Sequence, residues 1–296
     1  MNNKDLGSEE INKLALQNLF SGKLNEAQNF FEINATENPS FITLNNFGAF
    51  CYKNLRTDKS NPAISLLKSA LKHKNNFRSN IILGDIYLYN KKYNYANSFY
   101  HDALKLSEIA ELHNNYAISL YYQKKFTEAK GHFSQSIKMI DKEYKYIPAS
   151  SEVASLINIK DYNQASDTFD LLIQKIDQTE VDFSLLHLAY GCRKYDFVIN
   201  NCYKALEGWV INDIDYKYII SAFVLEAKLD EAQKFKIEVF KTIQEYEFLN
   251  TKQIQQFDIS YNKAISSKGF DELIYVPEVL SQEYLYYFDK IDELDL

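Results

Sequence analysis

The sequence predicts an all-α fold, a solenoid of about seven antiparallel helix pairs, and three observations predict it. Glycine occurs 8 times and proline 4 times in 296 residues, so long helices with short connections are favoured over a sheet with many turns. A small residue recurs about every 34 residues along most of the chain. The 23 tyrosines and 20 phenylalanines, many of them placed around these small residues, offer large surfaces for packing between helices.

Most copies of the repeat have an aromatic residue or leucine, two mostly polar residues and a small residue, often with an aromatic four positions later; the copy at Ala63 follows a longer loop and lacks the first aromatic residue or leucine. Leu24, Ala27 and Phe31 form the first copy. The small residues of the seven copies are Ala27, Ala63, Ala96, Ala129, Ala165, Val198 and Ala232. A second series lies about twelve positions earlier in most copies, and small residues in both series would let the backbones of two crossing helices approach closely. The members of this second series are Ala15, Gly48, Gly84, Ala117 and, with larger side chains, Val153, Leu186 and Ile220.

The repeats define a predicted array over residues 8–245, followed by two terminal segments. The seven units lie near residues 8–40, 41–76, 77–109, 110–145, 146–178, 179–212 and 213–246. Residues 247–270 are predicted to hold a capping helix, because apolar residues there follow helical spacing and an array needs a polar outer end. Residues 271–296 form an acidic aromatic segment with a predicted helix over Val279–Leu294. Two interpretations stay open for this segment: a second capping helix, or a tail that docks on its own array or on a partner.

Composition and charge exclude several classes of protein. No apolar run approaches the roughly 20 residues of a membrane-spanning helix, and residues 1–10 lack the features of a secretory signal. Three scattered cysteines predict reduced thiols rather than a disulfide framework, so a cytoplasmic location without membrane contact is expected. The net charge of −7 lies entirely in residues 271–296, and the balanced remainder offers no basic face for nucleic acid.

The sequence shows no recognisable catalytic, metal-binding or phosphate-binding motif. The five histidines show no HExxH spacing, and no glycine-rich phosphate loop occurs. We therefore expect a protein that is not an enzyme, with no catalytic residues, no metal site and no cofactor.

The repeat resembles the tetratricopeptide repeat family, whose unit is about 34 residues long. The first unit carries the resemblance at Ala15, Gly22, Ala27, Phe31 and Pro39. The chain departs from the family pattern because the tryptophan near the start of the first helix is absent from every unit, and only Pro39 marks the end of a unit. The resemblance implies a right-handed superhelical solenoid in which the first helix of each pair lines a concave surface.

The resemblance also implies which residues bind a partner on that surface. The predicted partner-binding residues are Asn45, Tyr52, Arg78, Tyr89, Asn114, Ile118, Tyr121, Tyr122, His187 and Tyr190. Tyrosine is enriched at binding hot spots, and Asn45 and Asn114 are predicted to hydrogen-bond the backbone of an extended peptide. The carboxylate clamp that some relatives use for chaperone tails is disfavoured, because Asn46 alone matches its pattern.

The sequence thus predicts a protein- or peptide-binding scaffold or adaptor that uses the concave face of the array. A regulatory receptor for a peptide or a small ligand is the alternative, and an RNA-binding helical repeat is less favoured. The sequence does not determine the oligomeric state.

Overall fold

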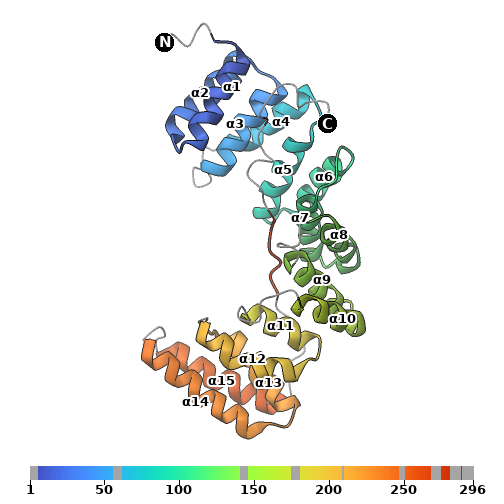
Figure 1. Cartoon of the computed structure of the whole chain (residues 1–296), viewed down its shortest axis with the longest axis vertical. Helices are drawn as coiled ribbons and strands as arrows, with labels where there is room; N and C mark the ends of the chain where they lie inside the picture. The colour runs from blue at the N-terminus through green and yellow to red at the C-terminus, as the bar shows by residue number, and fades with distance from the viewer. Residues whose placement is uncertain are drawn as a thin grey trace. The chain divides into compact units, whose positions relative to one another are not determined.

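The computed structural model describes residues 6–55, 62–140, 146–174, 181–208, 210–246, 251–267, 275–280 and 288. Over these residues the chain forms fifteen α-helices and no strand (Figure 1). The predicted all-α fold of repeated helix pairs is therefore confirmed. Among the helices so described, none is both long enough and apolar enough to cross a lipid bilayer.

The helices follow one another as pairs with short connections. Their bounds are α1 Ser8–Phe20, α2 Leu24–Glu37, α3 Phe41–Asn54, α4 Ala63–His73, α5 Phe77–Tyr89, α6 Tyr93–Leu104, α7 Ala110–Tyr122, α8 Phe126–Met139, α9 Tyr146–Asn158, α10 Tyr162–Ile173, α11 Phe183–Gly191, α12 Tyr195–Gly208, α13 Asp213–Leu225, α14 Leu229–Tyr246 and α15 Thr251–Ser267. The odd-numbered helices from α1 to α13 are the first helices of their pairs.

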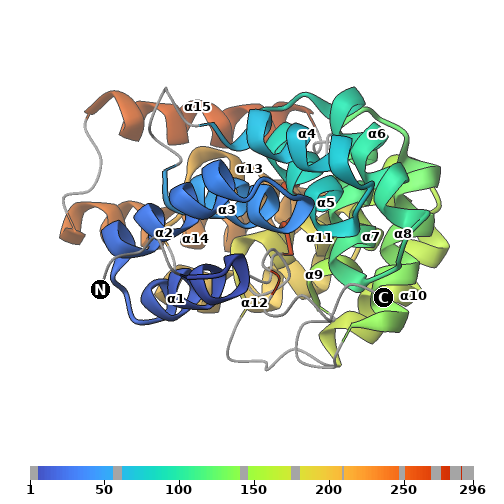
Figure 2. The same cartoon turned by 90° about the horizontal axis from the view of Figure 1, so that it is seen from above.

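The chain divides into two compact units. The first contains Met1–Lys125, Lys138–Ile140 and Val279–Leu296, and the second contains Phe126–Ile137 and Asp141–Glu278. In the first unit α1 packs on α2, α3 on α4 and α5 on α6, and α3, α5 and α7 form a contacting row (Figure 2). In the second unit α9 packs on α10 and α11 on α12, while α13 packs on α14 and α15.

The small residues of the repeat lie where paired helices approach most closely. All seven small residues in the second helices are buried. Gly84 on α5 shows the constraint most clearly, since a Cβ atom there would lie 2.4 Å from the ring of Tyr100 on α6. The period that the sequence shows is therefore the period of helix crossings.

A residue with positive φ, in the left-handed backbone conformation, follows the first helix of every pair whose turn is described. The residues with positive φ are Gly22, Lys91, Lys124, Lys160, Arg193 and Ala227. Each lies five positions before the small residue of the next helix. The N–H of the residue that follows donates a hydrogen bond back to the helix, as when Lys92 N–H donates to the Tyr87 carbonyl over 2.8 Å. Because only Gly22 is a glycine, the other five turns carry no glycine signal in the sequence.

The C-terminal region differs from its prediction. Helix α15 lies within 247–270, where a capping helix was predicted, and packs on α13. The helix predicted over Val279–Leu294 is wrong at Val279, Leu280 and Phe288, which are not helical; the rest of that range lies outside the described residues. The physical reason is that the main-chain polar groups of Leu280 and Phe288 bond to asparagine side chains instead of to helix neighbours.

Replacing Gly84 with alanine is expected to lower the free energy of unfolding by about 1–3 kcal/mol, because the added methyl group collides with the buried Tyr100 ring. Gly131→Ala on α8 is the matched control: nothing lies within 4 Å of its Cβ position, so a gain of roughly 0.5–1 kcal/mol in helix propensity is expected. Urea unfolding measures both variants. Equal midpoints for Gly84→Ala and the wild type would show that the two helices do not pack this closely.

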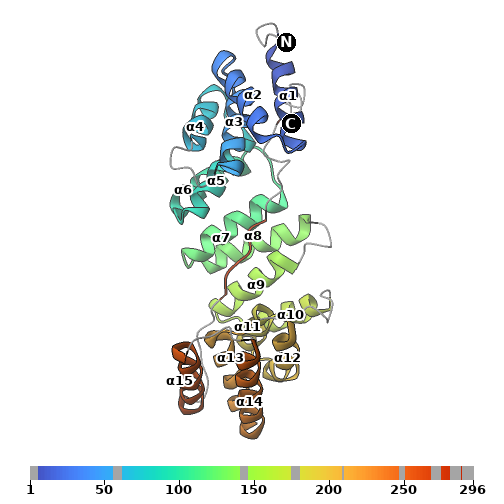
Figure 3. The same cartoon turned by 90° about the vertical axis from the view of Figure 1, so that its left-hand side faces the viewer.

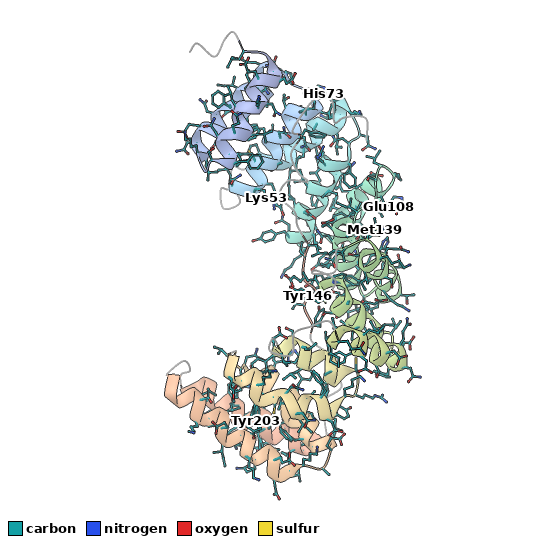
Figure 4. All side chains as sticks on the ribbon, viewed as in Figure 1. Lys53, His73, Glu108, Met139, Tyr146 and Tyr203 are labelled. Carbon is teal, nitrogen blue, oxygen red and sulfur yellow. The ribbon has the colours of Figure 1, made fainter. Side chains whose placement is uncertain are left out.

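Stability is expected to fall as the pH drops below about 6.5, partly through His113 on α7. Burial lowers the pKa of His113, and the nearby Glu108 carboxylate, labelled in Figure 4, opposes this effect from 3.9 Å. The unfolded chain therefore binds a proton at a higher pH than the folded chain, so the contribution is intact above the ordinary pKa and is lost as the pH falls below it. His113→Gln should flatten the decline of the melting temperature between pH 7 and pH 5. A decline as steep as in the wild type would rule out this role of His113.

Candidate functional site

Two described residues of the C-terminal segment, Leu280 and Phe288, bond through their main chain to helices of the first unit. Beside α3, Phe288 N–H donates to Asn46 Oδ1 over 3.0 Å, and the Phe288 carbonyl accepts from Asn46 Nδ2 over 3.3 Å. Beside α7, Leu280 N–H donates to Asn115 Oδ1 over 3.0 Å, and the Leu280 carbonyl accepts from Asn115 Nδ2 over 2.8 Å. An asparagine amide carries a donor and an acceptor, so one side chain can satisfy both polar groups of one residue.

The two asparagines occupy equivalent positions in their helices. Each lies two residues before a small residue of the crossing series, Asn46 before Gly48 and Asn115 before Ala117. Both amides are buried. Figure 3 shows Tyr275–Leu280 as an extended, non-helical segment drawn in dark red, and its last residue, Leu280, bonds to Asn115 on α7. The repeat thus presents the same amide to the same segment at two helices of one row.

A third asparagine supports the contact at α3. Asn12 on α1 accepts from Asn46 Nδ2 over 2.7 Å and donates its own Nδ2 hydrogen to the Phe288 carbonyl over 3.2 Å. Asn45 Nδ2 donates to Asn46 Oδ1 over 3.3 Å. These bonds orient the Asn46 amide so that its donor and its acceptor both face Phe288.

A carboxylate supports the contact at α7. Asp85 Oδ1 on α5 accepts from Asn115 Nδ2 over 3.1 Å and from the Tyr100 hydroxyl over 2.7 Å. Tyr100 is the same residue whose ring packs on Gly84. The close helix crossing therefore also positions Asn115.

The side chain of Phe288 lies between an aromatic ring and a cation. Its centroid is 5.7 Å from the Phe41 ring, edge to face, and 4.2 Å from the guanidinium carbon of Arg78. The ring is 5% exposed. A guanidinium within about 6 Å of a ring is attracted by its quadrupole, so this site favours an aromatic side chain.

The described residues hold no metal-binding cluster and no activated thiol. No group of three histidine, cysteine or acidic residues among them could hold a metal ion. Burial raises the pKa of each of the thiols of Cys51, Cys192 and Cys202 to about 12, so these cysteines stay protonated and are poor nucleophiles. What the site offers is hydrogen bonding to a main chain and a place for an aromatic ring.

The predicted site residues of the first unit divide into three groups. Arg78 contacts the C-terminal segment. Asn45 and Asn114 instead hydrogen-bond to the neighbouring asparagines, and Asn45 Oδ1 also accepts from the Ser79 hydroxyl over 2.9 Å. The remaining residues are either buried (Tyr52, Ile118 and Tyr121) or exposed (Tyr89, 68%, and Tyr122, 40%). A role for these residues in partner binding stays a prediction.

The two predicted residues of the second unit belong to a packed cluster. His187 Nε2 lies 2.9 Å from Asp215 Oδ1, although the geometry is that of a close contact rather than an aligned hydrogen bond. The His187 and Tyr190 rings lie 4.3 Å and 5.1 Å from the Tyr218 ring. These side chains connect α11 with α13, and their role in binding likewise stays a prediction.

Three residues that hold the segment, Asn12, Asn46 and Asn115, are not among the ten predicted partner-binding residues, although the concave surface that the resemblance implies includes Asn12. Asn46 entered the prediction only as a partial match to the chaperone-tail clamp. The signal that could have found Asn46 and Asn115 is an asparagine two residues before the small residue of the first helix, repeated two units apart. Asn12 carries no such signal, because it lies three residues before Ala15.

A comparison with known families gives a match over more than half of the chain. A family model described as "Pga1: GPI-Mannosyltransferase II co-activator" matches residues 104–284, more than half of the 296 residues. The chain belongs to the Pga1 family. A comparison with curated protein sequences gives no match.

Solved structures share the helical-repeat fold. A tetratricopeptide repeat protein from Parabacteroides merdae is similar with a TM-score of 0.56 at 14% identity, over 86% of this chain and 98% of that chain. The pilF protein of Pseudomonas aeruginosa is similar with a TM-score of 0.49 at 17% identity, over 85% of this chain and 96% of that chain. The likeness to the Parabacteroides merdae protein shows that this Pga1-family chain has a tetratricopeptide-like fold.

Alanine in place of Asn115 is expected to speed hydrogen exchange of the Leu280 amide by about fivefold or more, because that amide loses its acceptor. Asn46→Ala should do the same for the Phe288 amide. Asn80→Ala on α5 is the matched control, since this buried asparagine bonds to Asn75 and Asn76. Exchange measured by mass spectrometry would contradict the contacts if all three variants behaved alike.

Proposed function

We propose that this chain is a non-enzymatic scaffold or adaptor that binds an extended segment of a partner protein on its first unit. The observation that carries the proposal is the pair of asparagines, Asn46 and Asn115, each holding both main-chain polar groups of one residue. Every residue except proline offers the same two main-chain groups. A second polypeptide can therefore use the contacts that the chain's own segment uses.

The size of these contacts suits reversible binding. Four hydrogen bonds of this type contribute roughly 2–6 kcal/mol in total, and burial of one phenylalanine contributes about 1.5–3 kcal/mol. Association costs several kcal/mol in lost freedom of motion, so a partner held by these contacts alone binds weakly. Such an affinity is common for adaptors that must release their partners.

The family match supports a protein as partner. A co-activator works through the protein that it activates, and the family description names GPI-mannosyltransferase II. On this proposal, an extended segment of that enzyme is the first partner to test. We also propose, as the sequence predicts, that the chain has no enzymatic activity and that it is located in the cytoplasm.

A synthetic peptide with the sequence of residues 279–296 is expected to bind the full-length Phe288→Ala chain, whose own anchor at this site is removed. Adding Asn46→Ala to that chain should weaken binding about tenfold or more, because the peptide main chain loses both bonds to that amide. Adding Asn80→Ala instead should leave the affinity unchanged. Fluorescence anisotropy of the labelled peptide measures these affinities.

Thermal melting serves as the control for folding, and only variants that melt with wild-type cooperativity are compared. The proposal fails if the peptide binds no version of the chain, or if Asn46→Ala and Asn80→Ala weaken binding equally.

A further inference from the structure

Resting on the proposed function, we propose that the first unit selects partner segments with a phenylalanine in the place of Phe288. We further propose that the chain's own C-terminal segment competes for this site. A partner then binds only by displacing the segment. The competitor and the partner share one chemical class: an extended polypeptide with an aromatic side chain.

Selectivity comes from the side chain, because the main-chain bonds carry no sequence information. The Phe288 ring contacts the Phe41 ring edge to face and the guanidinium of Arg78, and Phe288 is almost fully buried. An aliphatic side chain would lose the attraction between the ring and the cation. An acidic side chain would pair with Arg78 but would leave its charge against the Phe41 ring. The aromatic residue is the one that satisfies both neighbours.

A second anchor lies eight residues earlier in the segment. Leu280 is 8% exposed, whereas its neighbour Val279 is 46% exposed, so the contact at α7 buries one apolar side chain selectively. Packed helices lie about 8–10 Å apart, which puts α3 roughly 16–20 Å from α7 across α5. Eight residues can span about 26 Å when extended. A partner segment with an apolar residue eight positions before its phenylalanine can therefore reach both asparagines.

Competition follows from the covalent connection between the segment and the unit. A tethered ligand acts at an effective concentration that can reach the millimolar range. The apparent affinity for a free segment is lowered by the fraction of molecules in which the site is open. Weakening the anchor of the tethered segment should thus raise the affinity for a free one by the same factor.

The test compares full-length wild-type, Phe288→Ala and Val279→Ala chains by anisotropy with two labelled peptides. One peptide has the sequence of residues 279–296, and the other carries alanine in place of its phenylalanine. We expect the first peptide to bind Phe288→Ala about tenfold or more tighter than it binds the wild type. Val279→Ala, which alters the exposed neighbour in the same segment, should bind like the wild type.

The alanine-containing peptide and Arg78→Gln test the selectivity for an aromatic ring. The alanine-containing peptide should bind the Phe288→Ala chain about tenfold more weakly than the first peptide. Introducing Arg78→Gln into that chain should weaken binding of the first peptide and leave the affinity for the alanine-containing peptide nearly unchanged. Arg78 is only partly buried, so this variant tests the ring site with little risk of unfolding.

The possible results separate the two proposals. Equal binding of the first peptide to wild-type and Phe288→Ala chains, lost in Asn46→Ala, would overturn the competition and keep the peptide site. No binding to any chain would overturn both. Equal binding of the two peptides would overturn the aromatic selectivity. Sedimentation at the assay concentration must show a monomer, because a dimer that separates in Phe288→Ala would assign the bound segment to a second copy and overturn intramolecular competition.

Discussion

The first unit depends on one constraint: paired helices approach each other closely at a glycine or an alanine. At Gly84 the absent side chain leaves room for the Tyr100 ring, and the hydroxyl of that ring reaches Asp85. Asp85 then holds the Asn115 amide that bonds to Leu280. Three successive contacts, Gly84 with Tyr100, Tyr100 with Asp85 and Asp85 with Asn115, thus connect the helix crossing to the site. The same residues that give the repeat its period also give the site its geometry.

Buried asparagines explain why this face attracts a polypeptide. Most buried polar groups in proteins have hydrogen-bond partners, and leaving one unsatisfied costs about 1–3 kcal/mol. Asn46 and Asn115 are buried, and part of their bonding capacity is met by the main chain of the C-terminal segment. Removing that segment would leave these amides short of partners unless water or another chain replaced it. The fold of the first unit and the occupancy of its site are therefore coupled.

The tyrosine-rich composition serves packing at most of the positions where the sequence predicts binding. Tyr52 and Tyr121 are buried in the first unit, and Tyr190 packs in the second unit against Tyr218. Tyr89 and Tyr122 keep exposed surface. The second unit has its own aromatic cluster around His187 and Asp215. The two units share one repeat pattern but carry different side chains beside the small residues: buried asparagines in the first unit, and an aromatic cluster with His187 and Asp215 in the second.

The sequence by itself determined the helical class and the period of the repeat, because small residues at helix crossings recur at fixed intervals and are visible without coordinates. It left open whether the C-terminal segment caps the array or docks on the array or on a partner, and the predicted role of Arg78 in partner binding stays a prediction. It could not determine that Leu280 and Phe288 bond to Asn115 and Asn46, since 165 and 242 residues separate these pairs along the chain. Local helical spacing favoured a helix over Val279–Leu294, whereas at Leu280 and Phe288 hydrogen bonds to distant asparagines prevailed. Only the tertiary structure decided this, because a main chain bonds to whichever donors and acceptors the folded molecule brings within reach.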